Sequence, residues 1–378
     1  MVARYLRICA LTALAVLGCA ANDDAAPDAG AAGSGGNAGG NAGGSGATSG
    51  GNTGFPSGGS SGSSSGGSAG SAGGGAGDAG TDAPDDSALP TGTWLSGAAC
   101  EGVLDGSFGT WRGRAVEIAG VWADDSDNQR NVWVLQMDYA NWSGPIDVAN
   151  GGIFPNEGES WAKAAAGAYD ERWKESLTNI KKARQGKGTT YIRFAHEFNG
   201  DWYWPVLSGD AESFKQAWVR FYNLKQSIFP EGKLAWSPND GTTINLDVRT
   251  AYPGSQYVDV IAVDSYNWDP PATDAQEFSS KINKLDSFGA PLGLEAWRKF
   301  AESKGVPMAI SEWSGVASRG DFPEYMTELH KWIAAHAGSG PGQIAYEILF
   351  NCPWSNNDFE LHPSTAQPNA ADRYRQEW

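Results

Sequence analysis

Eight short apolar runs alternate with helical patterns over residues 90–378 of this chain. These runs lack the polar/apolar alternation of half-exposed strands, so we predict strands buried on both faces of a parallel sheet. Strands that alternate with helices over this length favour a (β/α)8 barrel. The predicted strands are residues 94–97, 115–122, 146–154, 190–197, 234–238, 258–266, 308–312 and 345–351.

Several helices between these strands are indicated by an apolar stripe at helical spacing. We predict helices over residues 170–185, after Asp210, over 295–304 and over 321–337. Gly305 and Gly338 follow the last two and are expected to end them. Residues 124–130 are expected to form a long loop or a short helix. Four tryptophans lie on helix faces and are predicted to be core residues: Trp173, Trp218, Trp297 and Trp332.

Residues 1–19 have the pattern of a bacterial export signal. Arg4 and Arg7 precede an apolar run that is too short to span a bilayer as a mature helix. The run ends in Val-Leu-Gly-Cys, which resembles a lipobox, so Cys19 is predicted to be lipidated. The alternative is an ordinary signal peptide with an incidental cysteine. We therefore expect an exported protein anchored at the cell surface or outer membrane.

Residues 20–89 consist mostly of Gly, Ala, Ser and Asn, with seven Asp and no Lys or Arg. Such a segment buries too little apolar surface to offset chain entropy, so a disordered linker is predicted. The net charge of −17 for the whole chain leaves about −12 on residues 90–378. No basic surface for nucleic acid is indicated, and a monomer is expected.

Glu197 and Glu312 each end one of the apolar runs. The carboxyl ends of barrel strands meet in one crevice, so both carboxylates are expected there. Glycosidic bond cleavage needs a proton donor and a second carboxylate at the anomeric carbon. The alternative for each glutamate is a structural ion pair, for Glu197 with Arg193 and for Glu312 with a base distant in the sequence.

The sequence His196-Glu197-Phe198-Asn199-Gly200, with Trp202 and Trp204, resembles the fourth-strand signature of glycoside hydrolase family 26. The resemblance extends to Ile310-Ser311-Glu312-Trp313 and to the sixth strand around Tyr266. It implies a retaining (β/α)8 enzyme with Glu197 as general acid/base and Glu312 as nucleophile. Tyr266 resembles the family tyrosine that hydrogen-bonds the nucleophile.

Most members of that family are β-mannanases, and a minority act on β-1,3-xylan or mixed-linkage β-glucan. The resemblance therefore predicts an endo-acting enzyme on a β-linked polysaccharide, with β-1,4-mannan first. The aromatic run Trp202-Tyr203-Trp204-Pro205 departs from the Trp-Phe-Trp-Trp-Gly of typical mannanases, and Ser314 follows Trp313 where Gly is usual. The resemblance thus specifies the chemistry rather than the sugar.

Aromatic side chains after the strands are candidates for sugar contacts, because flat rings stack on sugar C–H faces. Trp354 is expected to form the platform of the central subsite, and Asp264 to bind a hydroxyl or to serve inside the barrel. The predicted substrate-binding residues are His196, Trp202, Trp204, Tyr266, Trp268, Trp313 and Trp354.

Other kinds of site are weakly indicated. The acidic stretch 124–128 lacks the Gly and Glu of a calcium-binding loop, and a solvated loop is favoured. His196-Glu197 has no second histidine at the zinc spacing, and residues 90–378 contain no Gly-x-Ser-x-Gly elbow. No metal or cofactor is predicted. Two alternatives stay open, a non-catalytic glycan-binding protein and an envelope-glycan transglycosylase on the same barrel.

Cys100 and Cys352 follow the first and eighth predicted strands. Those strands are neighbours in a closed barrel, so a disulfide between these residues is expected in an exported protein. The alternative is two unrelated buried thiols.

Overall fold

The computed structural model of the chain describes residues 92–356 and 358–378. The predicted signal peptide with Cys19 and the predicted linker lie outside the described residues. Within the described part of the chain, no helix has the length and apolar character needed to cross a membrane.

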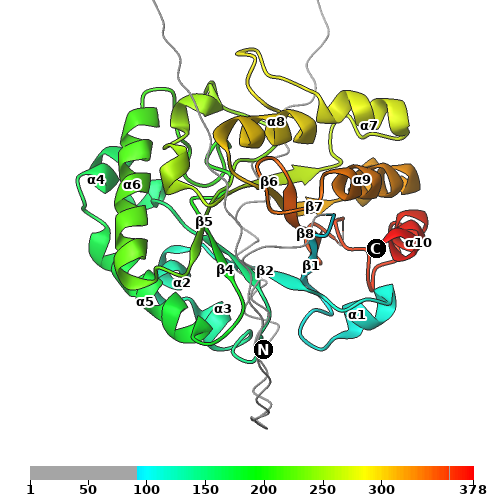
Figure 1. Cartoon of the computed structure of the whole chain (residues 1–378), viewed down its shortest axis with the longest axis horizontal. Coiled ribbons are helices and arrows are strands. Elements are labelled where there is room, and N and C mark those ends of the chain that lie inside the picture. Colours follow the sequence, from blue (N-terminus) through cyan, green and yellow to red (C-terminus); the bar gives the residue numbers. More distant parts are fainter. Residues whose placement is uncertain (1–91, 357) are drawn as a thin grey trace, which may run out of the picture. The chain divides into compact units, whose positions relative to one another are not determined.

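Eight parallel strands close into a barrel in sequence order, β1 pairing with both β2 and β8 (Figure 1). All eight predicted strands are present. Their bounds are β1 Leu95–Cys100, β2 Ile118–Ala123, β3 Ile146–Asn150, β4 Thr190–Phe194, β5 Lys233–Trp236, β6 Val260–Tyr266, β7 Met308–Ser314 and β8 Ile344–Asn351. The (β/α)8 prediction is therefore confirmed.

Helices surround the barrel and carry the predicted core tryptophans. The α-helices are α1 Ser107–Arg112, α2 Ser126–Asn131, α3 Trp133–Gln136, α4 Trp161–Ala165, α5 Asp170–Arg184, α6 Ala211–Ile228, α7 Ala275–Ile282, α8 Leu294–Lys304, α9 Pro323–His336 and α10 Pro368–Glu377. Short 3-10 turns are η3 Pro155–Glu157, η4 Val248–Ala251, η5 Ser255–Tyr257 and η6 Ala317–Arg319. Residues 124–130 thus contain most of the short helix α2.

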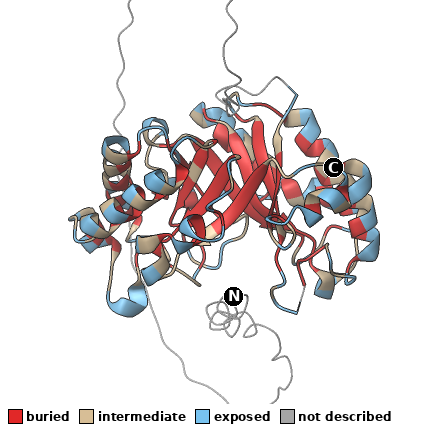
Figure 2. Cartoon of the chain, turned by 90° about the horizontal axis from the view of Figure 1, so that it is seen from below, coloured by how far each residue is buried: buried red, intermediate tan, exposed pale blue. Residues whose placement is uncertain are grey.

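Successive residues of each strand face opposite sides of the barrel wall. In β4, Ile192 and Phe194 pack toward the helices, whereas Arg193 reaches carboxylates on β3 and β6. The strands are buried almost throughout, and the helices expose one face (Figure 2). Trp173, Trp218, Trp297 and Trp332 are buried between helices and sheet, as predicted. The barrel interior is small and apolar at its centre, where Ala99, Ile118, Ala235, Val260, Ala262, Ala309 and Ile348 cluster.

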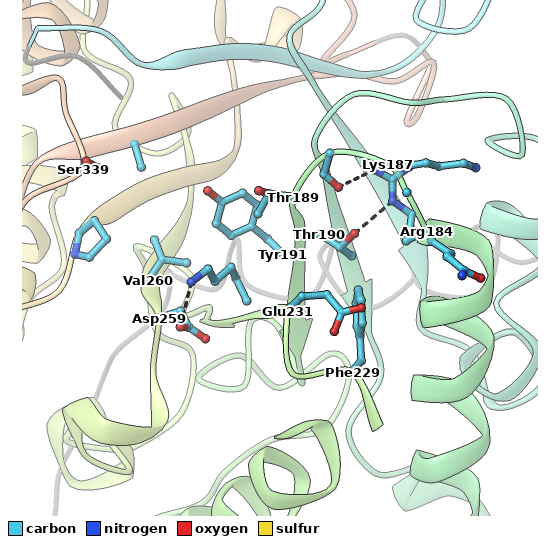
Figure 3. Close-up of a pocket in the computed structure, with 16 residues that line it drawn as sticks. Arg184, Lys187, Thr189, Thr190, Tyr191, Phe229, Glu231, Asp259, Val260 and Ser339 are labelled. Atoms are coloured by element: carbon cyan, nitrogen blue, oxygen red, sulfur yellow. Dashed lines mark hydrogen bonds and ion pairs between the residues drawn. The ribbon is translucent and has the colours of Figure 1, made fainter. Parts of the chain in front are cut away.

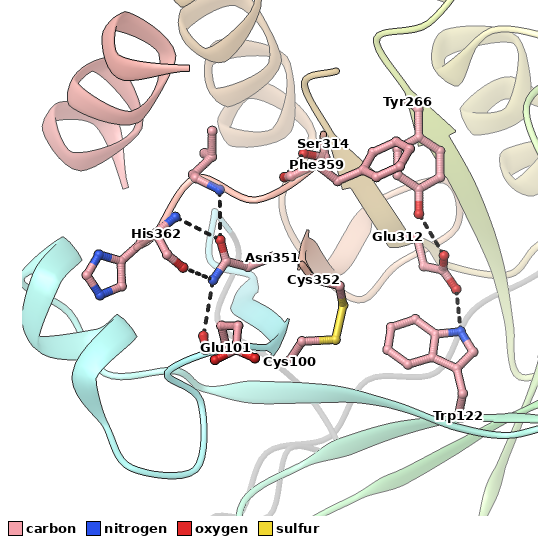
Figure 4. Close-up of a disulfide and its surroundings, with 11 residues drawn as sticks. Cys100, Glu101, Trp122, Tyr266, Glu312, Ser314, Asn351, Cys352, Phe359 and His362 are labelled. Carbon is pink, nitrogen blue, oxygen red and sulfur yellow. Dashed lines mark hydrogen bonds between the residues drawn. A yellow bond between two sulfur atoms is a disulfide. The ribbon is translucent and has the colours of Figure 1, made fainter. Parts of the chain in front are cut away.

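The predicted disulfide between Cys100 and Cys352 is present (Figure 4). Cys100 ends β1 and lies in register with Asn351 of β8, so the bridge joins the two strands where the barrel closes. The two cysteines are 252 residues apart in the sequence. A loop of that length corresponds to about 5 kcal/mol of stabilisation in the chain-entropy model.

Candidate active site

Glu197 lies three residues past β4 on backbone that has left strand geometry. Ala195 and Glu197 have φ angles of 54° and 52°, in the left-handed region that residues with side chains rarely adopt. Neighbouring strands hold this turn. The Ala195 N–H donates to the Asn150 carbonyl at 2.8 Å, and the Glu197 N–H donates to the Ser237 carbonyl at 2.7 Å. Strain of this kind persists where surrounding structure over-determines the conformation, and it is frequent at active sites.

The Glu197 carboxyl group accepts hydrogen bonds on both oxygens. The Asn239 amide donates to Oε1 at 2.6 Å, and the Trp202 indole N–H donates to Oε2 at 2.7 Å. Burial, followed by the charge of Glu312, raises the pKa of Glu197 to about 7, while the two hydrogen bonds act in the opposite direction. A carboxyl group with such a pKa can hold a proton near neutrality and then release it, as a general acid/base must.

Asn199 fixes the amide that reaches Glu197. Its Oδ1 accepts from the Asn239 backbone N–H at 2.8 Å, and its Nδ2 donates to the carbonyls of Asn239 and Gly241 at 2.9 and 2.7 Å. All three bonds orient the loop after β5. The asparagine of the recognised fourth-strand signature therefore acts through Asn239 on the acid/base.

Glu312 lies within β7 with its carboxylate held by three donors, two of which, Tyr266 and Trp122, are drawn in Figure 4. The Tyr266 hydroxyl donates to Oε2 at 2.8 Å, as the family resemblance implied. The Trp122 indole N–H and the Arg193 guanidinium donate to Oε1 at 3.0 and 2.7 Å. Hydrogen bonds from a cation and two neutral donors stabilise negative charge on these oxygens. This environment suits a nucleophilic carboxylate.

Arg193 is the cation at the floor of the site. Its buried guanidinium pairs with Asp147 at 2.6 Å, Asp264 at 3.1 Å and Glu312 at 2.7 Å. Burial disfavours its charge, but Asp147, Asp264 and Glu312 outweigh that cost and raise the pKa of Arg193 well above its usual value. The Glu197–Arg193 pair expected as an alternative does not form. Arg193 pairs with Glu312 instead, so Glu312 does make the ion pair with a distant base that is its alternative reading. Asp264 is fully buried, so of its two predicted roles the internal one is observed.

Half-buried aromatic rings follow β6 and β8 beside Glu312. Trp354 and Trp268 lie nearly parallel to Phe359, with ring centroids 5.8 and 6.4 Å apart and interplanar angles of 21° and 18°. Phe359 also contacts Tyr266, at 5.1 Å between centroids. The loops after β6 and β8 therefore bring both predicted tryptophans next to the residue that holds Glu312.

Two tryptophans predicted to bind substrate are corrected by the structure. Trp313 is fully buried, stacks on Trp378 and donates its indole N–H to Glu347, because it faces the helices when its neighbour Glu312 faces inward. Trp204 is also buried, and its indole N–H donates to the His196 carbonyl at 2.7 Å. Trp204 supports the turn that carries Glu197 instead of lining the crevice.

His196 is buried against the rings of Tyr203 and Trp204, at 5.1 and 5.3 Å between centroids. Burial, and then the charge of Arg193, hold the pKa of His196 well below its usual value, so the ring is neutral. Its Nε2 lies 3.7 Å from Oδ2 of Asp124. His196 thus packs under the site beside a carboxyl group that the sequence assigned to a loop.

Sequence reasoning missed Trp122, Asn239 and the role of Arg193. Strand parity is a signal for Arg193, because it lies two residues after the inward-facing Tyr191 on β4. No local pattern marks Trp122 or Asn239. In the described residues, no group of three or more metal-ligating side chains is gathered. Asp125 of the acidic stretch caps α2 by accepting from the backbone of Asp127 and Asn128.

A pocket of about 540 Å³ lies at the opposite end of the barrel, where the strands begin (Figure 3). Thr190 and Tyr191 at the start of β4, Lys233 of β5 and Val260 of β6 line it. The active sites of (β/α)8 enzymes lie at the carboxyl ends of the strands. This pocket is therefore separate from the two glutamates.

Residues 162–291 match the model of Glycosyl hydrolase family 26. Over this segment the chain is similar to that family. The matched segment contains Glu197 and Tyr266 and ends before Glu312. Family 26 is a family of glycosidases, and the crevice that holds Glu197 and Glu312 is the candidate site for such chemistry.

Two curated relatives are similar to parts of this chain. Endoglucanase H of Acetivibrio thermocellus is 23% identical over 300 residues, which cover 77% of this chain and 30% of that protein. Mannan endo-1,4-beta-mannosidase A and B of Caldalkalibacillus mannanilyticus is 32% identical over 136 residues, which cover 32% of this chain and 25% of that protein. The chain spans between a quarter and a third of the length of these relatives.

Solved structures show the same fold. The catalytic domain of the Bacillus sp. JAMB-750 GH26 endo-beta-1,4-mannanase is similar with a TM-score of 0.51 and 19% identity, over 74% of this chain and 85% of that chain. A Cellulomonas fimi endo-beta-1,4-mannanase double mutant is similar with a TM-score of 0.52 and 17% identity, over 75% of this chain and 73% of that chain.

Proposed function

We propose that this family 26 domain is an endo-acting, retaining glycoside hydrolase that cleaves a β-linked polysaccharide. One observation carries the proposal: Glu197 and Glu312 lie in contrasting environments in one crevice. Burial raises the pKa of Glu197 to about 7, whereas Glu312 is bound by the Arg193 cation. Two carboxyl groups with such different surroundings divide into a proton donor and a nucleophile.

The reaction follows from these positions. Protonated Glu197 donates to the glycosidic oxygen as Glu312 attacks the anomeric carbon and forms a glycosyl-enzyme ester. The ester has no negative charge, so the repulsion that helps to raise the pKa of Glu197 disappears. Glu197 then removes a proton from water, which releases the sugar with its configuration retained. Tyr266 holds Glu312 for the first step.

β-1,4-Mannan is the first candidate substrate. Relatives named as mannan endo-1,4-beta-mannosidases support it, and Endoglucanase H supports a β-glucan as the next candidate. Trp202 and Trp354 are the rings we assign to stacking on sugars, because each is only partly buried after β4 or β8. Trp268 is partly buried after β6, but the Arg319 guanidinium lies over its ring at 4.6 Å from the centroid. The positions of these rings and of the loops determine which polysaccharide can bind.

The test is product release from β-mannan, glucomannan, β-1,3-xylan and mixed-linkage β-glucan by the full-length protein and by Glu312→Ala. Release of oligosaccharides that is lost in the variant, with β-anomers appearing first in proton NMR spectra, supports the proposal. Products longer than the starting oligosaccharides would identify a transglycosylase. Binding without release in both proteins would identify a glycan-binding protein.

We also propose that the enzyme is attached to the bacterial surface through a lipid on Cys19. The lipobox-like sequence before Cys19 and the following linker support this arrangement. A tether of about 70 residues would span roughly 45 Å as a flexible coil, which suits an insoluble polymer. Cys19→Ser should move the protein from the membrane fraction to the soluble fraction, and no change would refute the anchor.

A further inference from the structure

Asp124 lies at the mouth of the barrel and is not one of the two catalytic carboxyl groups. It is the first residue after β2, two residues beyond Trp122, whose indole N–H reaches Glu312. Alternate residues of a strand face the same side, and Ile118 and Trp122 of β2 belong to the inner face of the barrel. Asp124 therefore continues the inner face toward the open end, next to the nucleophile.

The carboxyl group of Asp124 is enclosed but not bonded. Its side chain is 20% exposed, and His196 Nε2 lies 3.7 Å from its Oδ2, beyond hydrogen-bond length. Apart from its own backbone N–H, no described residue donates a hydrogen bond to it. Asp125, the next residue, instead accepts two bonds from the backbone of α2. Asp125 has a structural role, whereas Asp124 faces the crevice without a partner.

Charged groups of both signs lie around Asp124, with the carboxyl groups prevailing. The surrounding groups are Asp125 on its own segment, Glu312 on β7, and Arg193 and the neutral His196 on β4 and the turn after it. Burial, and then Asp125, raise the pKa of Asp124 to about 7, with Glu312 adding to the effect and Arg193 opposing it. Near pH 6 the side chain is therefore mostly a neutral acid, which can both donate and accept a hydrogen bond.

We propose that Asp124 is a specificity-determining residue whose carboxyl group hydrogen-bonds a ring hydroxyl of the sugar that Glu312 attacks. The inference rests on the proposed function of this crevice. A sugar hydroxyl supplies the partner that the protein does not, and a polar group in an enclosed site discriminates against sugars that lack a matching hydroxyl. The neutral form also keeps a third negative charge away from Glu312. Full activity then requires a proton on both Glu197 and Asp124.

The experiment compares full-length wild type with Asp124→Ala, Asp124→Asn and Asp125→Asn on the polymer that the wild type cleaves. Asp124→Ala should lower kcat/KM about 10- to 100-fold near pH 5.5, the loss of one hydrogen bond in an enclosed site. Asp124→Asn, which keeps a donor and an acceptor, should recover most of that loss. Asp125→Asn keeps a good helix cap and should stay within about twofold of the wild type there.

The alkaline side of the pH profile separates binding from a structural role. In the wild type, the plot of log(kcat/KM) against pH should fall above about pH 7 with the slope expected for loss of two protons, one from Glu197 and one from Asp124. In Asp124→Asn it should fall with the steepness of one proton. Equal activity of Asp124→Ala and Asp125→Asn, or an unchanged steepness in Asp124→Asn, would overturn the inference while the wild type stays active. A wild type that neither cleaves nor binds any polymer would overturn the proposed function and this inference together.

Discussion

Replacing Trp202 by Phe should move the alkaline limit of activity to higher pH. The indole N–H donates to Glu197 at 2.7 Å and lowers the pKa of that carboxyl group, because the bond favours its charged form. Phenylalanine keeps an aromatic ring but has no donor. A hydrogen bond to a charged group contributes about 1.5–3 kcal/mol, and 1.36 kcal/mol corresponds to one pH unit. Water can replace part of the lost bond at this site, so we expect a rise of about one pH unit.

The direction of the pH shift follows from the protonation state that Glu197 needs for catalysis. Glu197 has to be protonated in the free enzyme, so a higher pKa preserves activity to a higher pH. The assay is kcat/KM on soluble polysaccharide between about pH 5 and pH 9. Trp204→Phe is the matched control, since its indole N–H donates to the His196 carbonyl, and the alkaline limit should not move. An alkaline limit in Trp202→Phe that is unchanged, or that moves to lower pH, would refute the assignment of Glu197 as the acid.

Other predictions concern the nucleophile, the barrel seam and the charge at Asp124. Tyr266→Phe removes one donor from Glu312 and should lower kcat roughly 100-fold, measured by steady-state kinetics with folding checked by circular dichroism. Cys352→Ser should lower the free energy of unfolding in urea by about 3–5 kcal/mol, and reduced wild type should match it. Asp124 binds its proton more tightly in the folded than in the unfolded protein, so its contribution to stability is lost as pH rises from about 4 to 7. Asp124→Asn should therefore gain roughly 2–3 kcal/mol over wild type on going from pH 5 to pH 8, measured by urea unfolding at each pH.

The barrel could be predicted because its strands are buried on both faces and read as continuous apolar runs. The predicted strand ends differ from the observed ends where the backbone leaves strand geometry. The predicted fourth strand runs to Glu197, but β4 stops at Phe194 because Ala195 adopts a left-handed conformation that only tertiary hydrogen bonds explain. The predicted helix over 321–337 begins at Pro323, because Asp321 accepts hydrogen bonds from the start of α10 instead.

Within the site, residues next to a recognised motif were predicted and residues that reach it from elsewhere were not. Tyr266 follows from the sixth-strand resemblance, whereas Asn239 is brought to Glu197 by a loop whose course depends on Asn199. Trp313 is next to Glu312 in the sequence, but it lies on the opposite side of β7 and does not reach the crevice. A tryptophan beside an inward-facing residue of a buried strand faces the helices. That rule is available from sequence alone once the strand and the inward residue are known.

The left-handed backbone at Ala195 and Glu197 restricts how a lineage of such proteins can diverge. Glycine would relieve strain at either position. At position 197 it would also remove the carboxyl group, so glycine is an acceptable replacement only at position 195. An insertion or deletion of one residue in this turn would exchange the sides taken by His196 and Glu197. The outer wall of helices would be unaffected, and the rings of Trp268 and Trp354 would still be present. A one-residue indel would therefore leave a folded barrel in which Glu197 has left its position near Glu312.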